Sequence, residues 1–332
     1  MNRDLKADGW KVDTVDNTNM FRAVLKELAP YFKETDEQHF KNLLYIAQQN
    51  LGLAHCLQHN HLMHVAIPDS NCTLLKEKLA AHEYYELVGC YSSRKFTDSA
   101  IFNNNEISGV KSWLTNLTIA DVAMFSAVDI NNNLFNVAID LSQVEHSVDT
   151  VHPTSFGMKM AAPSNLVFPR SVPMDPNGVL HSIDSPESHR LSNYINFSFF
   201  TNHLGIILGL FKSFYHHPGP HFGKMDYRLQ PIKLEIGALT ELWKNNLQYF
   251  LISNDVNHSN SARFTQYAMS KKVLLDLIYL ILEVGIHEFV DPTTLKGMQF
   301  ADAITFSTHM HPLYKCHTNG FEYLHRSYLA VD

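Results

Sequence analysis

The chain has 332 residues, of which 45% are hydrophobic and 11% aromatic, and its net charge is −7 at pH 7. This composition is typical of a globular protein with a large core and excludes an intrinsically disordered chain. The acidic balance, without a basic cluster, argues against nucleic acid as a partner. No apolar run reaches the length of a membrane span, and the first residues show no signal-peptide core. We therefore expect a cytoplasmic protein with no membrane-embedded part.

Cysteines and histidines do not predict a metal site. The four cysteines, at positions 56, 72, 90 and 316, form no CxxC pair, which favours reduced thiols in a cytoplasm over a zinc site. His55 and His59 stand four residues apart on a predicted helix, followed by His61 and His64. Two histidines at that spacing can share a metal ion, but there is no HExxH motif and no nearby carboxylate completes a site. We interpret these histidines as surface and interface residues.

The predicted elements fall into three segments. Helices come first, at Asn19–Phe32, from Asp36 through Leu51, and at Thr73–Ala81. Strands follow, separated by Asn- and Ser-rich turns, at Leu87–Tyr91, Ser99–Phe102, Glu106–Thr115, Val122–Val128, Leu134–Asp140, Val144–Val148 and Ser164–Pro173. After a Pro- and Ser-rich link, Pro173–Ser188, helices return at Ser192–Tyr215, Gln230–Ile252, Ser261–Val284, Phe300–Tyr314 and Phe321–Tyr328. The order predicts an α+β chain with a helical domain (1–86), a β domain (87–184) and a helical bundle (185–332).

Two stretches of the β segment carry motifs. Residues 109–115 read G-V-K-S-W-L-T, and Ala120-Asp121 precedes the apolar run Val122–Val128. Residues 157–159 read G-M-K, and residues 166–173 read L-V-F-P-R-S-V-P. The first stretch resembles the signature G-x-K-x-W-[IL]-[TS] … A-D of the acyl-CoA dehydrogenase superfamily. The second resembles that superfamily's G-[MW]-[RK] … L-x-F-x-x-V-x-V-P, in the same order and at the expected separation.

The resemblance implies a fold and a cofactor. The fold would be a shortened helical N-domain, a central β barrel and a C-terminal four-helix bundle. The family places one long helix early in the chain, which would carry the second predicted helix past Gly52 to Leu62. The cofactor would be FAD or FMN, with Trp113 packing against the isoalloxazine and Thr115 bonding the ring near N5. The alternative interpretation of the motif is an ordinary hairpin with a core tryptophan.

A second family frame concerns the flavin diphosphate. In the family an R-x-x-F-G … Q segment supplies an Arg to the cofactor of a neighbouring subunit. Phe222, Gly223 and Gln230 fit the F-G … Q part, but the Arg position falls near Gly219, which is not basic. Lys224 or Arg228 remain as substitutes. An arginine at this position would bind the diphosphate through its planar guanidinium. Because it is missing, we expect a weakened FAD site or an FMN site.

The predicted helix at Phe300–Tyr314 bears on whether the reaction is a dehydrogenation or an oxygenation. Aligned with the dehydrogenases, Met310 stands where their catalytic Glu belongs, and the alternative base position falls at about Ile195. Neither side chain can accept a proton. Residues 307–315, S-T-H-M-H-P-L-Y-K, resemble instead the same helix of the reduced-flavin monooxygenases. There Ser307 and His309 match catalytic positions, and the His stabilises or protonates the oxygenated flavin. A purely structural His309 is the alternative.

The resemblance thus implies a flavin-dependent oxidoreductase, a two-component monooxygenase using reduced flavin from a partner reductase, O2 and a small hydrophobic or acyl substrate. One alternative is an acyl-CoA dehydrogenase with an unrecognised base. Another is a degenerate, non-catalytic subunit that assembles with an intact homologue. We expect a homodimer or homotetramer in the first two cases, because the family builds its diphosphate site between subunits.

Overall fold

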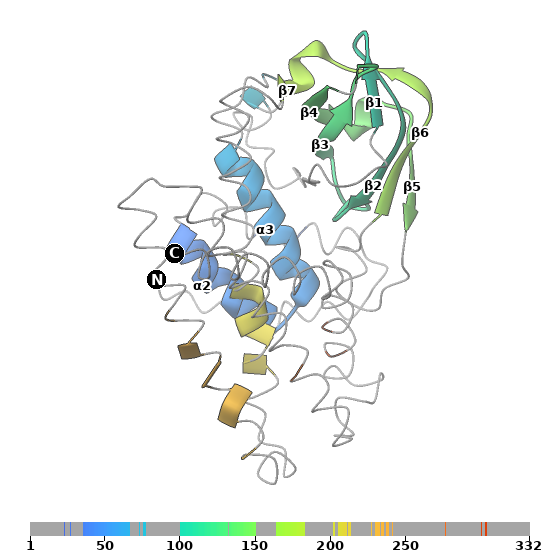
Figure 1. The fold of residues 1–332 in the computed structure, drawn as a ribbon. Coiled ribbons are helices and arrows are strands. Elements are labelled where there is room, and N and C mark those ends of the chain that lie inside the picture. Colours follow the sequence, from blue (N-terminus) through green and yellow to red (C-terminus); the bar gives the residue numbers. More distant parts are fainter. Residues whose placement is uncertain are drawn as a thin grey trace, which may run out of the picture. The chain divides into compact units, whose positions relative to one another are not determined.

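The computed structural model describes the chain in part (Figure 1). Described are residues 36–66, 100–131, 133–150 and 164–182, with positions 23, 27, 73, 76, 77, 202, 205–210, 212, 213, 227, 230–232, 234, 235, 237, 238, 241, 276, 300 and 303. The chain divides into two compact units. One contains Met1–His39 and His55–Ile195, and the other contains Phe40–Ala54 and Asn196–Asp332. No helix among the described residues is long and apolar enough to cross a membrane.

The second predicted helix is two helices, α2 (Asp36–Ala47) and α3 (Leu51–Ala66). The prediction of one continuous helix through Gly52 is therefore wrong. The break lies just before Gly52, because the Asn50 side chain accepts a hydrogen bond from the Leu53 amide at 2.9 Å. An asparagine in this position satisfies a backbone amide that begins a new helix, and so favours a start at this point over continuation.

A short described helical run, residues 205–210, packs closely on α2 in the second unit. A Cβ atom placed on Gly209 would lie 2.5 Å from the carbonyl oxygen of Leu44 and 2.8 Å from the Cβ of Ala47. One turn earlier, a Cβ on Gly205 would lie 3.0 Å from the Phe40 ring. Two glycines spaced four residues apart lie on one helical face, so this face approaches α2 more closely than any side chain would allow.

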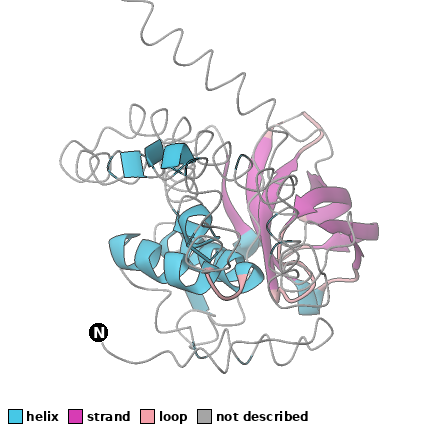
Figure 2. Cartoon of the chain, turned by 90° about the horizontal axis from the view of Figure 1, so that it is seen from below, coloured by secondary structure: helices cyan, strands magenta, loops and turns pink. Residues whose placement is uncertain are grey.

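The strands form one seven-stranded sheet in the order β5-β6-β2-β1-β3-β4-β7 (Figures 1 and 2). Their bounds are β1 Ala100–Asn103, β2 Glu106–Leu114, β3 Val122–Val128, β4 Leu134–Asp140, β5 Ser147–Thr150, β6 Ser164–Pro173 and β7 Val179–Ser182. All neighbours are antiparallel except β1 and β3. Asn104 and Asn105, with φ of 50° and 61°, form the two-residue turn between β1 and β2. Asparagine tolerates these angles, which match the twist of a tight hairpin.

The sheet curls on itself. Phe125 of β3 and Phe168 of β6 are separated by two intervening strands, yet their ring centroids are 6.4 Å apart. In a flat sheet three strand spacings would separate the two strands by about 14 Å. The side chains of five strands therefore converge on one apolar core, which includes Ala100, Ile107, Leu114, Ala123, Phe125, Val137, Ile139, Leu166, Phe168 and Val172. This closure agrees with the barrel expected from the sequence.

The strand predictions succeed where turns are clear. Three strands, β3, β4 and β6, have the predicted bounds. The strand β1 lies one residue later than predicted at both ends, and β2 ends one residue earlier than predicted. The strand predicted at Val144–Val148 lies later, at Ser147–Thr150, because Asp140 caps a short 3-10 turn at Leu141–Gln143. The prediction of a link without a strand at Pro173–Ser188 is wrong, since β7 pairs with β4 there. The strand predicted at Leu87–Tyr91 lies outside the described residues.

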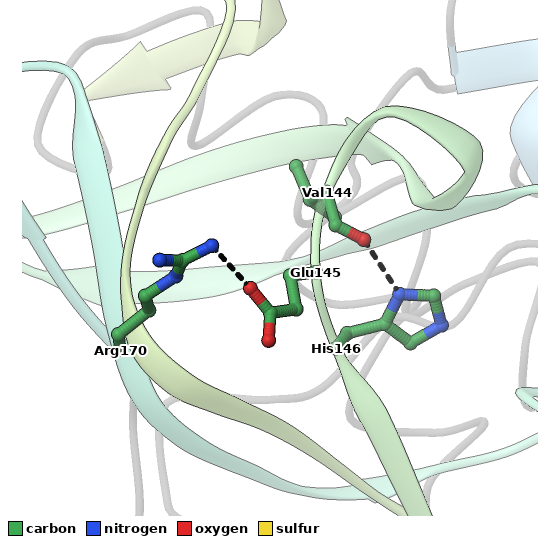
Figure 3. A network of polar contacts seen from close by, with 4 residues as sticks. All are labelled: Val144, Glu145, His146 and Arg170. Atoms are coloured by element: carbon green, nitrogen blue, oxygen red, sulfur yellow. Dashed lines mark hydrogen bonds and ion pairs between the residues drawn. The ribbon is translucent and has the colours of Figure 1, made fainter.

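Polar contacts at the β5 edge of the sheet are exposed (Figure 3). Arg170 of β6 pairs with Glu145, and their side chains are 74% and 57% exposed. Such a pair contributes little to stability. The neighbouring His146 ring donates from Nδ1 to the Val144 carbonyl oxygen at 3.0 Å, since a carbonyl can only accept. His146 therefore serves below as a histidine outside the proposed site.

The glycine contact gives a first prediction. Gly209→Ala forces the Leu44 carbonyl and the added methyl apart, so the free energy of unfolding should fall by about 1–3 kcal/mol. Gly237→Ala is the matched control, because Gly237 is also helical but a Cβ atom placed on it would have no neighbour within 4 Å. That variant should be neutral or more stable by up to about 1 kcal/mol. Urea unfolding midpoints measure both. Equal effects of the two substitutions would contradict the close approach of the helices.

Candidate functional site

An irregularity in β2 sets the direction of the motif residues. Ile107 and Leu114 are both fully buried in the core of the sheet, although seven residues separate them. Side chains of a regular strand alternate, so an odd separation would place the two on opposite faces. The pairing of β2 with β6 shows how this is resolved. Between the pairs Lys111–Leu166 and Leu114–Ser164, two residues of β2 face a single residue of β6. This bulge brings Leu114 inward.

The residues after Leu114 bond to α3. The Thr115 hydroxyl lies 3.0 Å from Nε2 of His59, and the Cys56 thiol donates to Oδ1 of Asn116 at 3.0 Å. Cys56 and His59 are one helical turn apart, so consecutive residues of the strand end meet one face of the helix. Asn116 adopts φ of 62°, which an asparagine tolerates. The strand end and the helix are thereby held in one arrangement.

The first part of α3, residues 51–61, is buried on every side, although it is rich in polar residues. All residues from Leu51 to His61 are buried, including His55, Gln58, His59 and Asn60. The interpretation of these histidines as surface residues is therefore wrong. The sequence did contain a signal, since residues 51–66 include no Asp, Glu, Lys or Arg. A helix without charges is one that can be buried all round.

Burial controls the charge of His59 and of His39. It lowers the pKa of His59 from 6.5 to about 4, so His59 is neutral at pH 7 and one ring nitrogen is an acceptor. His55 lies against it, with ring centroids 4.7 Å apart. On another side of the helix, His61 stacks on His39 at 3.7 Å. Burial, and then the charge of His61, hold the pKa of His39 well below its ordinary value.

The structure thus brings the predicted site residue Thr115 next to His59, which was not predicted as part of this site. Thr115 is half-buried beside His59. The backbone of Trp113 lies in β2, next to the bulge. Gln230 is helical and exposed, in the other unit. The remaining predicted site residues, Phe222, Gly223, Ser307 and His309, lie outside the described part of the chain.

The hydrogen-bonding groups of the described site are compatible with one edge of a flavin ring. A flavin presents N5 and a carbonyl oxygen along one edge, and both need a hydrogen-bonding partner when water is excluded. The Thr115 hydroxyl, half-buried at the end of β2, can donate or accept. Its neighbours in sequence include the buried residues Leu114, Leu117 and Ile119. The residues present are therefore compatible with the cofactor that the motif predicts.

Comparison with known proteins gives the fold. No family model and no curated protein matches the sequence. XiaF from Streptomyces sp., solved with FADH2 and glycerol, is similar with a TM-score of 0.73 at 12% identity, over 99% of this chain and 92% of that one. Butyryl-CoA dehydrogenase from Megasphaera elsdenii has a TM-score of 0.70 at 13% identity, over 96% and 95%. The chain has the acyl-CoA dehydrogenase-like fold.

A third similar structure, KijD3 in complex with FMN and a dTDP-linked sugar, has a TM-score of 0.68 at 12% identity, over 95% of this chain and 87% of that one. The α+β fold class predicted from the sequence is thus confirmed. At these identities the likeness extends to the fold and includes both dehydrogenases and proteins solved with FADH2 or FMN. It does not choose between the two branches. The boundaries between the three predicted domains and the site residues stay predictions.

The neutral state of His59 predicts a pH dependence. Its pKa in the folded chain, about 4, lies below the ordinary value of 6.5, so the unfolded chain binds the proton more tightly between these values. The stabilisation is complete above pH 6.5 and is lost as the pH falls through about 4. The contribution is about 3 kcal/mol, at about 1.4 kcal/mol per pKa unit.

Urea unfolding at pH 7.5 and 4.5 tests this prediction. His59→Phe removes the titrating group, so this variant should lose less stability between the two pH values than the wild type does. His146→Phe, at the β5 edge, should keep the wild-type difference. An unchanged pH dependence in His59→Phe would show that His59 is not a buried neutral group.

Proposed function

We propose that this protein is a flavin-dependent oxidoreductase that works as a two-component monooxygenase. A partner reductase supplies reduced flavin, and a small hydrophobic or aromatic compound is oxygenated with O2. The observation that carries the proposal is the 3.0 Å contact between the Thr115 hydroxyl and the buried imidazole of His59. It joins the threonine of the flavin motif to a group that is neutral at pH 7.

The roles of this chain's residues follow from their chemistry. Bound flavin, FAD or FMN, would supply the electrons and the carbon that reacts with O2. Thr115 would bond the ring near N5, and Trp113 would cover one face of it. His59 holds the Thr115 hydroxyl, and the bulge in β2 fixes the direction from which the hydroxyl approaches. Buried apolar neighbours exclude water, which strengthens each polar contact.

The lack of a base at the aligned positions supports the monooxygenase over the dehydrogenase, and the similar structures are compatible with either. XiaF was solved with FADH2, and KijD3 with FMN, and both have the same fold as this chain. The dehydrogenase needs a base for an α-proton, but Met310 and Ile195 occupy the aligned positions and cannot accept a proton. Bleaching of bound flavin by an acyl-CoA, in the absence of any reductase, would instead establish the dehydrogenase.

The third candidate is a degenerate subunit without catalysis. The missing Arg near Gly219 favours it, because the diphosphate loses a forked, permanently charged partner. The spacing of the flavin motif is retained at residues 109–115 of this chain, and flavin binding by the purified protein would exclude this candidate. The expected dimer or tetramer stays a prediction. Tyr227 and Leu234, 76% and 73% exposed at helical spacing, offer apolar surface for such an interface, and the mass of the particle in solution decides it.

The proposal predicts flavin binding that depends on Trp113. Trp113→Ala removes the ring expected to cover the isoalloxazine, and should weaken the binding of FMN or FAD by about 10-fold or more. Val110→Ala, three residues earlier on β2 with its side chain 37% exposed, should bind flavin like the wild type. Fluorescence titration measures the dissociation constants, and circular dichroism confirms that helical content is unchanged. Equal affinity in the Trp113 variant would remove Trp113 from the site.

A further prediction concerns His309, the catalytic residue implied by the resemblance, with Ser307 beside it. If His309 protonates the oxygenated flavin, His309→Ala should release hydrogen peroxide in place of oxygenated product. Peroxide formed per reduced flavin supplied by a reductase measures this uncoupling. A general acid contributes about 10²–10⁴-fold, so the change should be plain. His311→Ala is the control, because a position two residues on would lie on another face of the helix that the sequence predicts at Phe300–Tyr314. Unchanged coupling in His309→Ala would refute the role.

A further inference from the structure

One helical face in the second unit exposes large apolar side chains. Nine described residues between positions 227 and 241 are helical, and eight of them are exposed. Tyr227 and Leu234, at 76% and 73%, are the most exposed large hydrophobic side chains of the described residues, whereas Ile232 is only 8% exposed. At about 100° per residue, Tyr227 and Leu234 lie on one side of the helix and Ile232 lies on the opposite side. The exposed face therefore points away from the core of its own chain.

This face has the spacing of a contact between two helices. Tyr227, Pro231, Leu234 and Ala238 are all exposed and follow one another at intervals of four, three and four residues. We call these four residues the apolar stripe. Alternating intervals of three and four residues place side chains in a line along one side of a helix, as in a coiled coil. Single exposed apolar residues need no explanation, but a continuous line of them indicates a binding surface.

The apolar stripe is complementary to itself. In an antiparallel pair of helices related by a twofold axis, position i of one copy faces position j of the other, and j faces i. With the axis between positions 232 and 233, Tyr227 faces Ala238 of the second copy. The same axis sets Pro231 opposite Leu234. The largest side chain of the stripe thus faces the smallest, which allows the two helices to pack closely along its whole length.

The charges beside the stripe favour the same antiparallel axis. The counterpart of Glu235 is Gln230. The counterpart of Glu241 in the sequence is Lys224, which lies outside the described residues. Neither glutamate is therefore set opposite an acidic residue. A parallel pair of helices would set each glutamate against its own copy, and like charges at an interface oppose association.

We propose that the apolar stripe is an interface between two copies of this chain, in which the helices that carry it pack antiparallel about a twofold axis. The occupant is a second copy and not a different protein, because a surface that binds a different protein has no reason to match itself about such an axis. The inference concerns assembly and is independent of the reaction that the chain catalyses. It fixes the symmetry of the pair and the register, Tyr227 against Ala238.

The first test places a charge at the centre of the stripe. Leu234→Asp should raise the dissociation constant of the dimer by about 100-fold or more, because a twofold interface contains every residue twice. Ile130→Asp is the matched control, since Ile130 is 71% exposed but lies in the turn between β3 and β4, and it should dimerise like the wild type. Sedimentation velocity of the full chain, from about 0.1 to 100 μM, measures the association. A wild type that is monomeric throughout, or a Leu234→Asp variant that dimerises like the wild type, would overturn the inference.

The second test addresses the register and does not depend on the folding of Leu234→Asp. The double variant Tyr227→Cys, Ala238→Cys should form a disulfide-linked dimer on mild oxidation, because each new cysteine faces the other one in the second copy. Within one chain the two positions are about 16 Å apart along the helix, too far for a disulfide. Each single variant should stay unlinked, and the wild type measures any linkage through the four native cysteines. A double variant that links no more than the single variants would overturn the inference.

Titration of FMN and FAD into the same samples separates this inference from the proposed function. A wild type that binds flavin as a monomer overturns the inference alone. A dimer that is linked in the double variant, broken in Leu234→Asp and unable to bind flavin supports the inference and contradicts the proposed function.

Discussion

Burial of an uncharged but polar helix is the constraint on which this part of the molecule depends. The helix α3 carries three histidines among its buried residues. Each polar group on it must be satisfied by a neighbour or tolerated in a neutral form, since a buried charge without a partner costs several kcal/mol. Two residues that follow β2, Thr115 and Asn116, form hydrogen bonds with side chains of the helix. The motif strand is thus placed by the requirements of the helix as much as by its own sheet.

The histidines of α3 make contacts on different sides of the helix. His55 and His59 lie toward the strand end, while His61 stacks on His39. In the first, burial lowers the pKa of His59, and in the second, burial lowers the pKa of His39. His39 makes no hydrogen bond from either ring nitrogen to any described residue, so its place is held by packing and stacking. Stability and site chemistry are therefore linked, because acid that protonates the rings weakens the packing of the same helix that orients Thr115.

The sequence allowed the fold to be predicted better than the site. The strands β3, β4 and β6 have the predicted bounds because turns rich in Asn, Asp and Pro delimit them. The strand β7 was missed because Pro176-Asn177-Gly178 reads as a turn, and four residues after a turn give too short a pattern. The histidines were misjudged because their spacing was weighed for metal binding, and the lack of charge around them was not. The partnership of Thr115 with His59 spans 56 positions, and no local pattern predicts a contact at that separation.

The bulge at Ser112 and Trp113 has a consequence for how this strand can change in evolution. Ile107 and Leu114 both face the core although an odd number of positions separates them, and the extra residue in the bulge allows this. Deleting a single residue between these two would remove the bulge and shorten the path, and inserting one would exchange the sides on which Leu114 and Thr115 emerge. A change in the length of this segment therefore alters which side chains face the core, an effect that replacement of an exposed side chain such as Val110 does not have.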